Sequence, residues 1–193
     1  MLEKKYQEIE MKFKLNNSKD VLIILKSLGA EKVVDQEYQC DIYYAPSHRN
    51  FFEEEIISEW LRLRRTTSKE QLNYKRWLPI GEKIQTHCEE YETEVSDGFA
   101  LIKILEYMDF KEVIKVEKTR NCWKYEDVLI CIDEVTELGT FIELEYTKQV
   151  EEDSVKEISE YMEKMVYETF HAIVEPRDRR GYPYQMMALK GIL

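Results

Sequence analysis

Charged and apolar residues alternate in short segments along the whole chain, beginning near its N-terminus. In residues 6–14 (YQEIEMKFK), Ile9, Met11 and Phe13 share one parity, and glutamates and lysines take the other. A period of two predicts a β-strand with one apolar and one polar face. Comparable patterns predict further strands at residues 33–44, 60–66, 71–78, 86–95, 112–125, 128–135 and 140–149.

Helices are predicted between some of these strands. Ser18 is expected to cap a helix that runs to Leu28 and ends at Gly29. Ser96 or Asp97 caps a second helix, whose apolar stripe is predicted to consist of Phe99, Ile102, Leu105 and Tyr107. A third amphipathic helix is predicted to open at Asp153 and reach about residue 170, and a short one to cover residues 184–189.

The order strand, helix, long strand occurs twice, in residues 8–44 and again in residues 90–125. Such an internal repeat suits a closed barrel made of two similar halves. We therefore expect an α+β fold: a closed or nearly closed antiparallel β-barrel of about eight strands, with helices packed outside and a charged tunnel within. No linker divides the sequence, so a single domain covering residues 1–193 is predicted.

The charged residues of these strands recur at every second position. They are Glu8, Glu10 and Lys12; Arg62 and Arg64; Lys75; Glu90, Glu92 and Glu94; Lys118 and Arg120; Asp133; and Glu143 and Glu145. For any one strand, this pattern also fits the solvated face of an ordinary antiparallel sheet. When all strands are considered together, the amphipathic helices need the apolar faces to cover. The charged faces are then expected to line a lumen.

Both signs of charge occur on these faces, and they are segregated by strand. Arginine and lysine bind phosphate oxygens, and glutamates spaced i, i+2 point to one side and suit Mg²⁺ or Mn²⁺. A triphosphate accompanied by metal ions explains this mixture.

Composition narrows the possible partners. A net charge of −11 argues against duplex nucleic acid, and no apolar run approaches the roughly 18–20 residues that span a membrane. The N-terminus has no apolar secretory segment, so a cytoplasmic location is expected. The four widely spaced cysteines form no C-x-x-C pair and are expected to be reduced thiols. A homodimer is compatible with the sequence.

Five ordered motifs in residues 6–146 resemble those of the CYTH family, the triphosphate tunnel metalloenzymes, which include class IV adenylyl cyclases, thiamine triphosphatases and tripolyphosphatases. Its E-x-E-x-K motif matches residues 8–12, its R-x-R motif residues 62–64, its lysine strand residues 73–75, and its K-x-R motif residues 118–120. Its D-x(5)-G-x-F-x-E-x-E signature matches Asp133, Gly139, Phe141, Glu143 and Glu145.

The resemblance implies roles for these residues. Lys12, Arg62, Arg64, Lys75, Lys118 and Arg120 would bind the triphosphate. Metal ligands would come from Glu8, Glu10, Glu92, Glu94, Glu143 and Glu145. Glu10, Lys12 and Asp133 are the candidate catalytic residues, and Asp133 would position the cationic side chains or a metal-bound water.

Residues 41–44 (DIYY) resemble the D-x-Y-F of the class IV cyclase branch. Two departures concern the rim of the site. Asn50 stands where an aspartate is usual, and residues 73–77 (NYKRW) replace T-Y-K-G-P. The expected reaction is conversion of ATP to cyclic AMP and pyrophosphate. Hydrolysis of tripolyphosphate or thiamine triphosphate is the alternative, and a non-catalytic polyphosphate-binding module is a further one.

Overall fold

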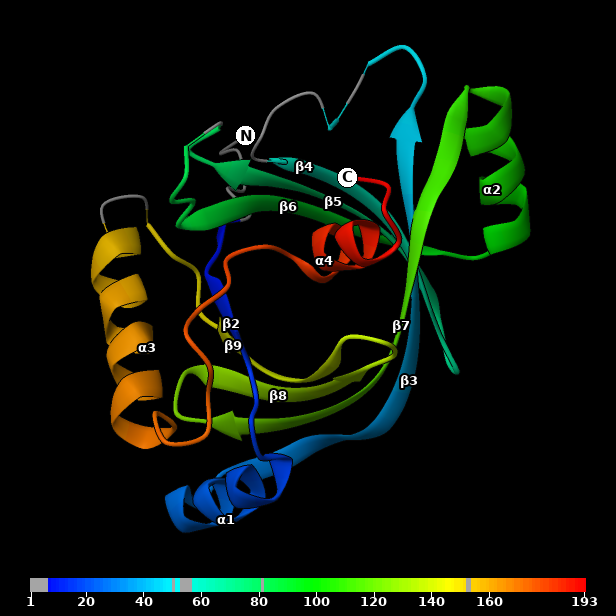
Figure 1. Cartoon of the computed structure of the whole chain (residues 1–193). Helices are drawn as coiled ribbons and strands as arrows, with labels where there is room; N and C mark the ends of the chain where they lie inside the picture. The colour runs from blue at the N-terminus through cyan, green and yellow to red at the C-terminus, as the bar shows by residue number, and fades with distance from the viewer. Residues whose placement is uncertain (1–6, 50, 53–56, 81, 152–153) are drawn as a thin grey trace. The chain divides into compact units, whose positions relative to one another are not determined.

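The computed structural model describes residues 7–49, 51–52, 57–80, 82–151 and 154–193, and its fold class is α+β. The strands are β1 (Gln7–Glu8), β2 (Glu10–Lys14), β3 (Glu31–Pro46), β4 (Glu59–Thr66), β5 (Glu70–Leu78), β6 (His87–Val95), β7 (Phe110–Tyr125), β8 (Val128–Val135) and β9 (Gly139–Tyr146). The helices are α1 (Ser18–Leu28), α2 (Gly98–Tyr107), α3 (Val155–Thr169) and α4 (Tyr182–Leu189). Figure 1 labels these elements along the chain.

The predicted strands are confirmed, and their pairings are antiparallel. Only Ile9 separates β1 from β2, so together they correspond to the single strand predicted at residues 6–14. The chain forms two compact units. Of the described residues, those within 38–117 and 180–193 belong to unit 1, and those within 7–37 and 118–179 belong to unit 2. That the two units make a single domain stays a prediction.

In unit 1, β6, β5, β4 and the second part of β3 follow one another in hydrogen-bonded order. Ile42, Tyr44 and Leu63 point to one face of these strands, where they pack with Leu105 of α2. The residues between them, such as Asp41 and Arg62, take the opposite face because side chains alternate along a strand. Helix and charged face therefore lie on opposite sides of the strands, as predicted.

In unit 2, the second part of β7 is followed by β8, β9 and β2. One face of this sheet is apolar and packs against α1 and α3 in a core that includes Met11, Val21, Ile130, Leu144 and Met162. In Figure 1, α3 lies beside β9 and β2. The opposite face again carries the charged residues.

The helix ends follow local rules, with some corrections. Asn17, and not Ser18, caps α1 by accepting a hydrogen bond from the backbone N–H of Lys19. Gly29 ends this helix with φ of 72°, a left-handed conformation that glycine adopts without steric cost. Asp97 caps α2, as one of the two expected residues. Asp153, expected at the start of α3, lies outside the described residues.

The apolar stripe predicted for α2 is only partly right. Leu105 is buried and Ile102 packs against the unit 1 core, but Phe99 and Tyr107 are 69% and 89% exposed. The helix carries apolar residues around most of its circumference, so periodicity alone does not determine which ones face the strands.

The expectation of four reduced thiols is wrong for one pair: Cys122 and Cys131 form a disulfide, whereas Cys40 and Cys88 are free. Glu126 and Asp127 connect β7 to β8, and this short turn sets Cys122 directly opposite Cys131 in the ladder. The predicted strand ends already contained this signal, because Tyr125 and Val128 flank the turn.

No helix in the part of the chain that the structure describes combines the length and apolar character needed to cross a membrane.

Candidate active site

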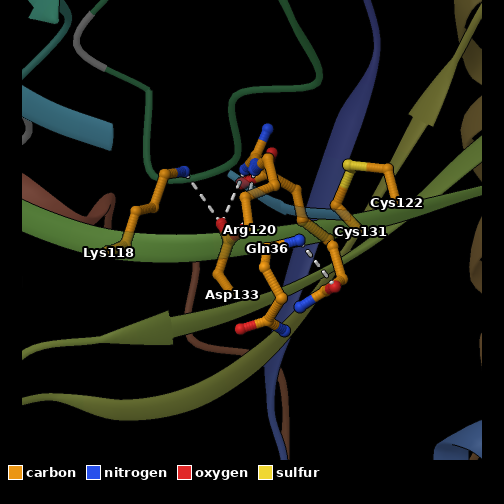
Figure 2. Close-up of a disulfide and its surroundings, with 8 residues drawn as sticks. Gln36, Lys118, Arg120, Cys122, Cys131 and Asp133 are labelled. Carbon is orange, nitrogen blue, oxygen red and sulfur yellow. Dashed lines mark hydrogen bonds and ion pairs between the residues drawn. A yellow bond between two sulfur atoms is a disulfide. The ribbon is translucent and has the colours of Figure 1, made fainter. Parts of the chain in front are cut away.

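The charged face of unit 2 is organised around Asp133, which is completely buried. Arg120 donates from Nε to Oδ1 at 2.7 Å and from Nη2 to Oδ2 at 2.6 Å, and Lys118 donates from Nζ to Oδ2 at 2.8 Å. Figure 2 shows Lys118 and Arg120, both on β7, directed at this one carboxylate of β8. The Cys122–Cys131 disulfide lies farther along the same two strands, β7 and β8. One buried aspartate thus fixes the positions of two cations.

The charge of Asp133 is maintained by these neighbours. Burial alone would raise the pKa of the carboxyl, but Arg120 and Lys118 outweigh burial and hold the pKa well below its usual range. Arg120 also donates from Nη2 to Oε1 of Glu143 at 2.6 Å, which extends the network to β9. Charge-assisted hydrogen bonds of this kind hold side chains in fixed orientations.

Strand register brings Lys12 to the same face. Lys12 pairs with Glu143, and Glu10 pairs with Glu145, on the adjacent strands β2 and β9. Burial lowers the pKa of the Lys12 ammonium, and the charges of Glu143 and Glu10 partly offset that effect. The predicted residues of the first and last motifs are therefore side by side.

The glutamates of unit 2 fit a hard divalent cation. Glu10 and Glu145 are carboxylates placed directly opposite each other, an arrangement that is unfavourable without a nearby positive charge. Among the described residues, no three histidine, cysteine or acidic side chains gather closely enough to hold a metal ion by themselves. Mg²⁺ typically uses only one or two protein carboxylates together with substrate phosphates and water, so this donor set suits it.

The charged face of unit 1 has its own buried aspartate, Asp41 on β3, which is 1% exposed. Arg64 donates to it from Nε and from Nη2, both at 2.7 Å. Nη1 of Arg62 lies 3.6 Å from Oδ2 of the same carboxylate. The two arginines of the R-x-R motif therefore share one carboxylate.

Amide side chains hold the glutamates on β6. Gln71 donates from Nε2 to Oε1 of Glu92 at 2.7 Å, and Asn73 donates to Glu90 and, at 3.5 Å, to Glu92. Nζ of Lys75 lies 3.7 Å from Oε1 of Glu90. Gln71 and Asn73 are both buried, so their amides are fixed hydrogen-bond donors to these carboxylates.

Tyr43 also faces this side of unit 1, opposite Arg62 in the ladder. Burial, with the charge of Asp41, raises the pKa of its phenol to about 12. The hydroxyl is therefore protonated at neutral pH, and its ring packs edge-on against Trp60 at 5.7 Å between centroids.

Comparison with known proteins identifies the family. The CYTH domain family model matches residues 6–173, which include all five motifs. The chain belongs to the CYTH domain family.

Several known proteins resemble this chain in sequence or in fold. A Methanocaldococcus jannaschii protein named "Putative adenylate cyclase MJ0240" is 34% identical over 156 residues, which cover 81% of this chain and 86% of that protein. The structure of PH1819 from Pyrococcus horikoshii OT3 has a TM-score of 0.77 at 31% identity, and covers 95% of this chain and 99% of its own. A Hippeastrum protein, "Putative adenylyl cyclase HpAC1", shares the fold with a TM-score of 0.59 at 17% identity, over 95% of this chain and 96% of its own.

Most of the predicted CYTH site residues lie in one of the two charged clusters. Unit 2 brings together Glu10, Lys12, Lys118, Arg120, Asp133, Glu143 and Glu145, and unit 1 brings together Arg62, Arg64, Lys75 and Glu92. Glu8 lies in β1, just before the break at Ile9. Glu94 is exposed and stands opposite Gln71 in the ladder.

Sequence reasoning missed three side chains that contact the predicted residues, and it placed a fourth, Glu90, on a charged face without assigning it a role. The missed side chains are Asp41, Gln71 and Asn73. Gln71 and Asn73 share strand parity with Lys75, and Glu90 shares it with Glu92, so the alternation contained the signal for these three. No site residue was predicted on β3, and the signal for Asp41 was its place in the segment that resembles D-x-Y-F. The departure at Asn50 lies outside the described residues.

The C-terminal arginines had no predicted position, and the structure places one of them beside β2. Arg177 lies 3.8 Å from Glu163 of α3, and its guanidinium approaches the carbonyl oxygen of Glu10 at 3.5 Å. Burial, together with Arg179, lowers the pKa of Arg177 to about 10. This segment continues along β2 through a bridge between Leu15 and Val174.

Proposed function

We propose that this CYTH protein is a metal-dependent enzyme acting on a triphosphate, and that its reaction is that of a class IV adenylyl cyclase. The observation that supports this most directly is the network in which Asp133 fixes Lys118 and Arg120 beside Glu143. Fixed cations next to carboxylates match the needs of phosphoryl chemistry, in which positioning and charge stabilisation do most of the work.

Three cations on each face would bind phosphate oxygens: Lys12, Lys118 and Arg120 in unit 2, and Arg62, Arg64 and Lys75 in unit 1. Their carboxylate partners keep them oriented before the substrate arrives, which reduces the reorganisation needed for catalysis. Asp133 is fully buried and already accepts three hydrogen bonds, so we assign it to positioning Lys118 and Arg120.

Glu10, Glu143 and Glu145 would hold Mg²⁺ or Mn²⁺, and Glu92 is the candidate ligand in unit 1. When bound, such an ion supplies Lewis-acid polarisation of the phosphoryl oxygens. The protein's own cations would hold the phosphate chain in place, and the glutamates would balance their charge.

In the cyclase reaction, the ribose 3′ oxygen forms a bond to the α-phosphorus while the bond from the α-phosphorus to the bridging oxygen of pyrophosphate breaks. The 3′ hydroxyl must also give up its proton. The candidate for the base that accepts this proton is Glu10, which lies beside Lys12 on β2. The 34% identity to a protein named as a cyclase favours this reaction.

Triphosphate hydrolysis is the second candidate. The Hippeastrum structure, from a protein named as a cyclase, is described as revealing a dominant triphosphatase activity. In that reaction, water attacks the terminal phosphorus, the bond from that phosphorus to the bridging oxygen breaks, and the products are orthophosphate and the remaining diphosphate. The same charged groups serve both reactions, so the location of the organic part of the substrate decides between them.

A panel of substrates tests the proposal. Purified protein is incubated with ATP, tripolyphosphate or thiamine triphosphate, each with Mg²⁺ or Mn²⁺, and the products are separated by ion-exchange chromatography. We expect cyclic AMP and pyrophosphate from ATP. Orthophosphate from tripolyphosphate or thiamine triphosphate, without cyclic AMP, would favour the triphosphatase.

The Glu143→Gln variant is expected to lose most of the activity, and the matched control Glu160→Gln, in an exposed pair with Lys156 on α3, is expected to keep it. Activity that survives in Glu143→Gln would point to a contaminant or to a different site. Tight binding of tripolyphosphate without turnover of any substrate would contradict the proposal of an enzyme and would favour a non-catalytic polyphosphate-binding module.

A further inference from the structure

We propose that Asp41 is a positioning residue for the arginines of the R-x-R motif, Arg62 and Arg64, and the unit 1 counterpart of Asp133. The inference rests on the proposed function, because it assigns a role in triphosphate binding. The carboxylate of Asp41 contacts both arginines. It accepts two hydrogen bonds of 2.7 Å from Arg64, and its Oδ2 lies 3.6 Å from Nη1 of Arg62.

The two aspartates occupy equivalent positions in their ladders. Asp41 stands directly opposite Arg64, and Asp133 stands directly opposite Arg120. In both cases the arginine uses Nε and Nη2 to bind both carboxylate oxygens. In both cases the strand also carries a second cation two residues before the arginine, on the same face.

That second cation approaches the same carboxylate in each unit. Lys118 reaches Asp133 at 2.8 Å, and Arg62 reaches Asp41 at 3.6 Å. The difference lies in chain order, because the aspartate precedes its cations in unit 1 and follows them in unit 2. The repeated arrangement indicates that R-x-R and K-x-R each require an aspartate on the neighbouring strand.

The surroundings of Asp41 favour a role in ligand binding over a purely structural ion pair. Its neighbour Ile42 packs in the unit 1 core, so the carboxylate itself points to the charged face. Within the described part of the chain, Nε of Arg62 is buried and has no hydrogen-bond partner. A buried donor of this kind is costly unless an acceptor completes it, and a phosphate oxygen is such an acceptor.

The Asp41→Asn variant distinguishes two possible roles of Asp41: orienting Arg62 and Arg64, or only neutralising their charge. Loss of a charge-assisted two-point contact is expected to raise KM for the substrate found in the panel, and Kd for tripolyphosphate, by ~10–100-fold. If Asp41 only neutralised the arginines, its removal would leave a more positive face and would tighten tripolyphosphate binding. Unchanged or tighter binding therefore overturns the proposal.

Two further variants keep the test decisive. Glu70→Gln is the matched control, because Glu70 pairs with Arg65 on the same strand β4 at 2.6 Å but outside the charged face. It is expected to change KM less than twofold. Circular dichroism reports whether Asp41→Asn folds; if it does not, Asp41→Glu keeps the charge but moves the carboxylate, and wild-type KM in that variant overturns the proposal.

A substrate-free measurement distinguishes failure of this inference from failure of the proposed function. The Nε–H of Arg64 is expected to give a slowly exchanging signal in ¹H–¹⁵N spectra, identified by its loss in Arg64→Lys. Asp41→Asn should remove or shift that signal even if the wild-type protein turns over no triphosphate. An unchanged signal overturns the role of Asp41, whereas a wild-type protein without turnover or tripolyphosphate binding overturns only the proposed function.

Discussion

Asp41 and Asp133 show how single carboxylates control the charged faces of this protein. Each is almost completely removed from solvent, a position that normally disfavours ionisation. Each is nevertheless surrounded by two cations that favour the charged form. The cost of burying the charge is thereby offset, and the cations lose the freedom to reorient.

The pH dependence of stability should report the environment of Asp133. Its folded-state pKa is depressed, so its contribution is fully present above the unfolded value of about 3.9 and is lost as pH falls through the folded pKa. In urea unfolding between pH 7 and pH 2, wild-type protein should lose more stability on acidification than Asp133→Asn. At pH 7 the variant should be less stable by about 3–5 kcal/mol, because it leaves buried cations without their partner.

The control for that series is Asp127→Asn, which removes an exposed pair with Lys148. Exposed pairs contribute little to stability, so this variant should follow the wild-type pH profile. A wild-type curve that matches Asp133→Asn at every pH would contradict the depressed pKa.

At the scale of elements, the hairpin of β7 and β8 joins three features in one register. The ladder places Lys118 opposite Val135, Arg120 opposite Asp133, and the two half-cystines opposite each other. A covalent link on this hairpin restricts the register that also pairs Arg120 with its aspartate. A slip of one residue would turn Asp133 into the apolar core.

Removing the disulfide should destabilise the protein without abolishing the fold. In the double variant Cys122→Ser/Cys131→Ser, the unfolded chain is no longer constrained by a disulfide loop. Because the two cysteines are nine residues apart, the free energy of unfolding should fall by about 2–3 kcal/mol. Urea unfolding measures this loss, and Cys40→Ser, at a free cysteine, is the matched control.

Thiol counting checks the disulfide independently. Alkylation of denatured protein followed by mass spectrometry should label two cysteines without a reductant and four after reduction. Four labelled cysteines in the unreduced protein would contradict the bond.

At the scale of the whole molecule, charge balance explains why a metal should be needed. The residues of unit 2 proposed for the site comprise three cations and four carboxylates: Lys12, Lys118 and Arg120 with Glu10, Asp133, Glu143 and Glu145. In unit 1, the cations Arg62, Arg64 and Lys75 share a face with four carboxylates: Asp41, Glu90, Glu92 and Glu94. Neither set has an excess of positive charge, and the chain as a whole carries −11.

Metal removal should therefore weaken triphosphate binding. By isothermal titration calorimetry, tripolyphosphate should bind at least ~10-fold more tightly with Mg²⁺ than with a chelator present. Glu145→Gln should raise the Mg²⁺ concentration needed for half-maximal binding, and Glu160→Gln should not. Equal affinity with and without a divalent cation would contradict this charge argument.

The sequence by itself determined the strands, the faces of their side chains and the family. Alternation assigns a residue to a face regardless of what lies opposite, so Lys12, Arg62, Arg120 and Glu143 were identified without knowing any neighbour. The ordered motifs then pointed to the CYTH family, which the match over residues 6–173 confirmed.

Only the tertiary structure decided which of these residues touch. Asp41 meets Arg64, and Asn73 meets Glu90, through strand register, which depends on core packing and turn geometry along the entire sheet. The exposed Phe99 of α2 has the same origin, because a helix with apolar residues on several faces is oriented by the surface it packs against. Contacts between residues distant in sequence are a property of the folded chain, and alternation along one strand does not contain them.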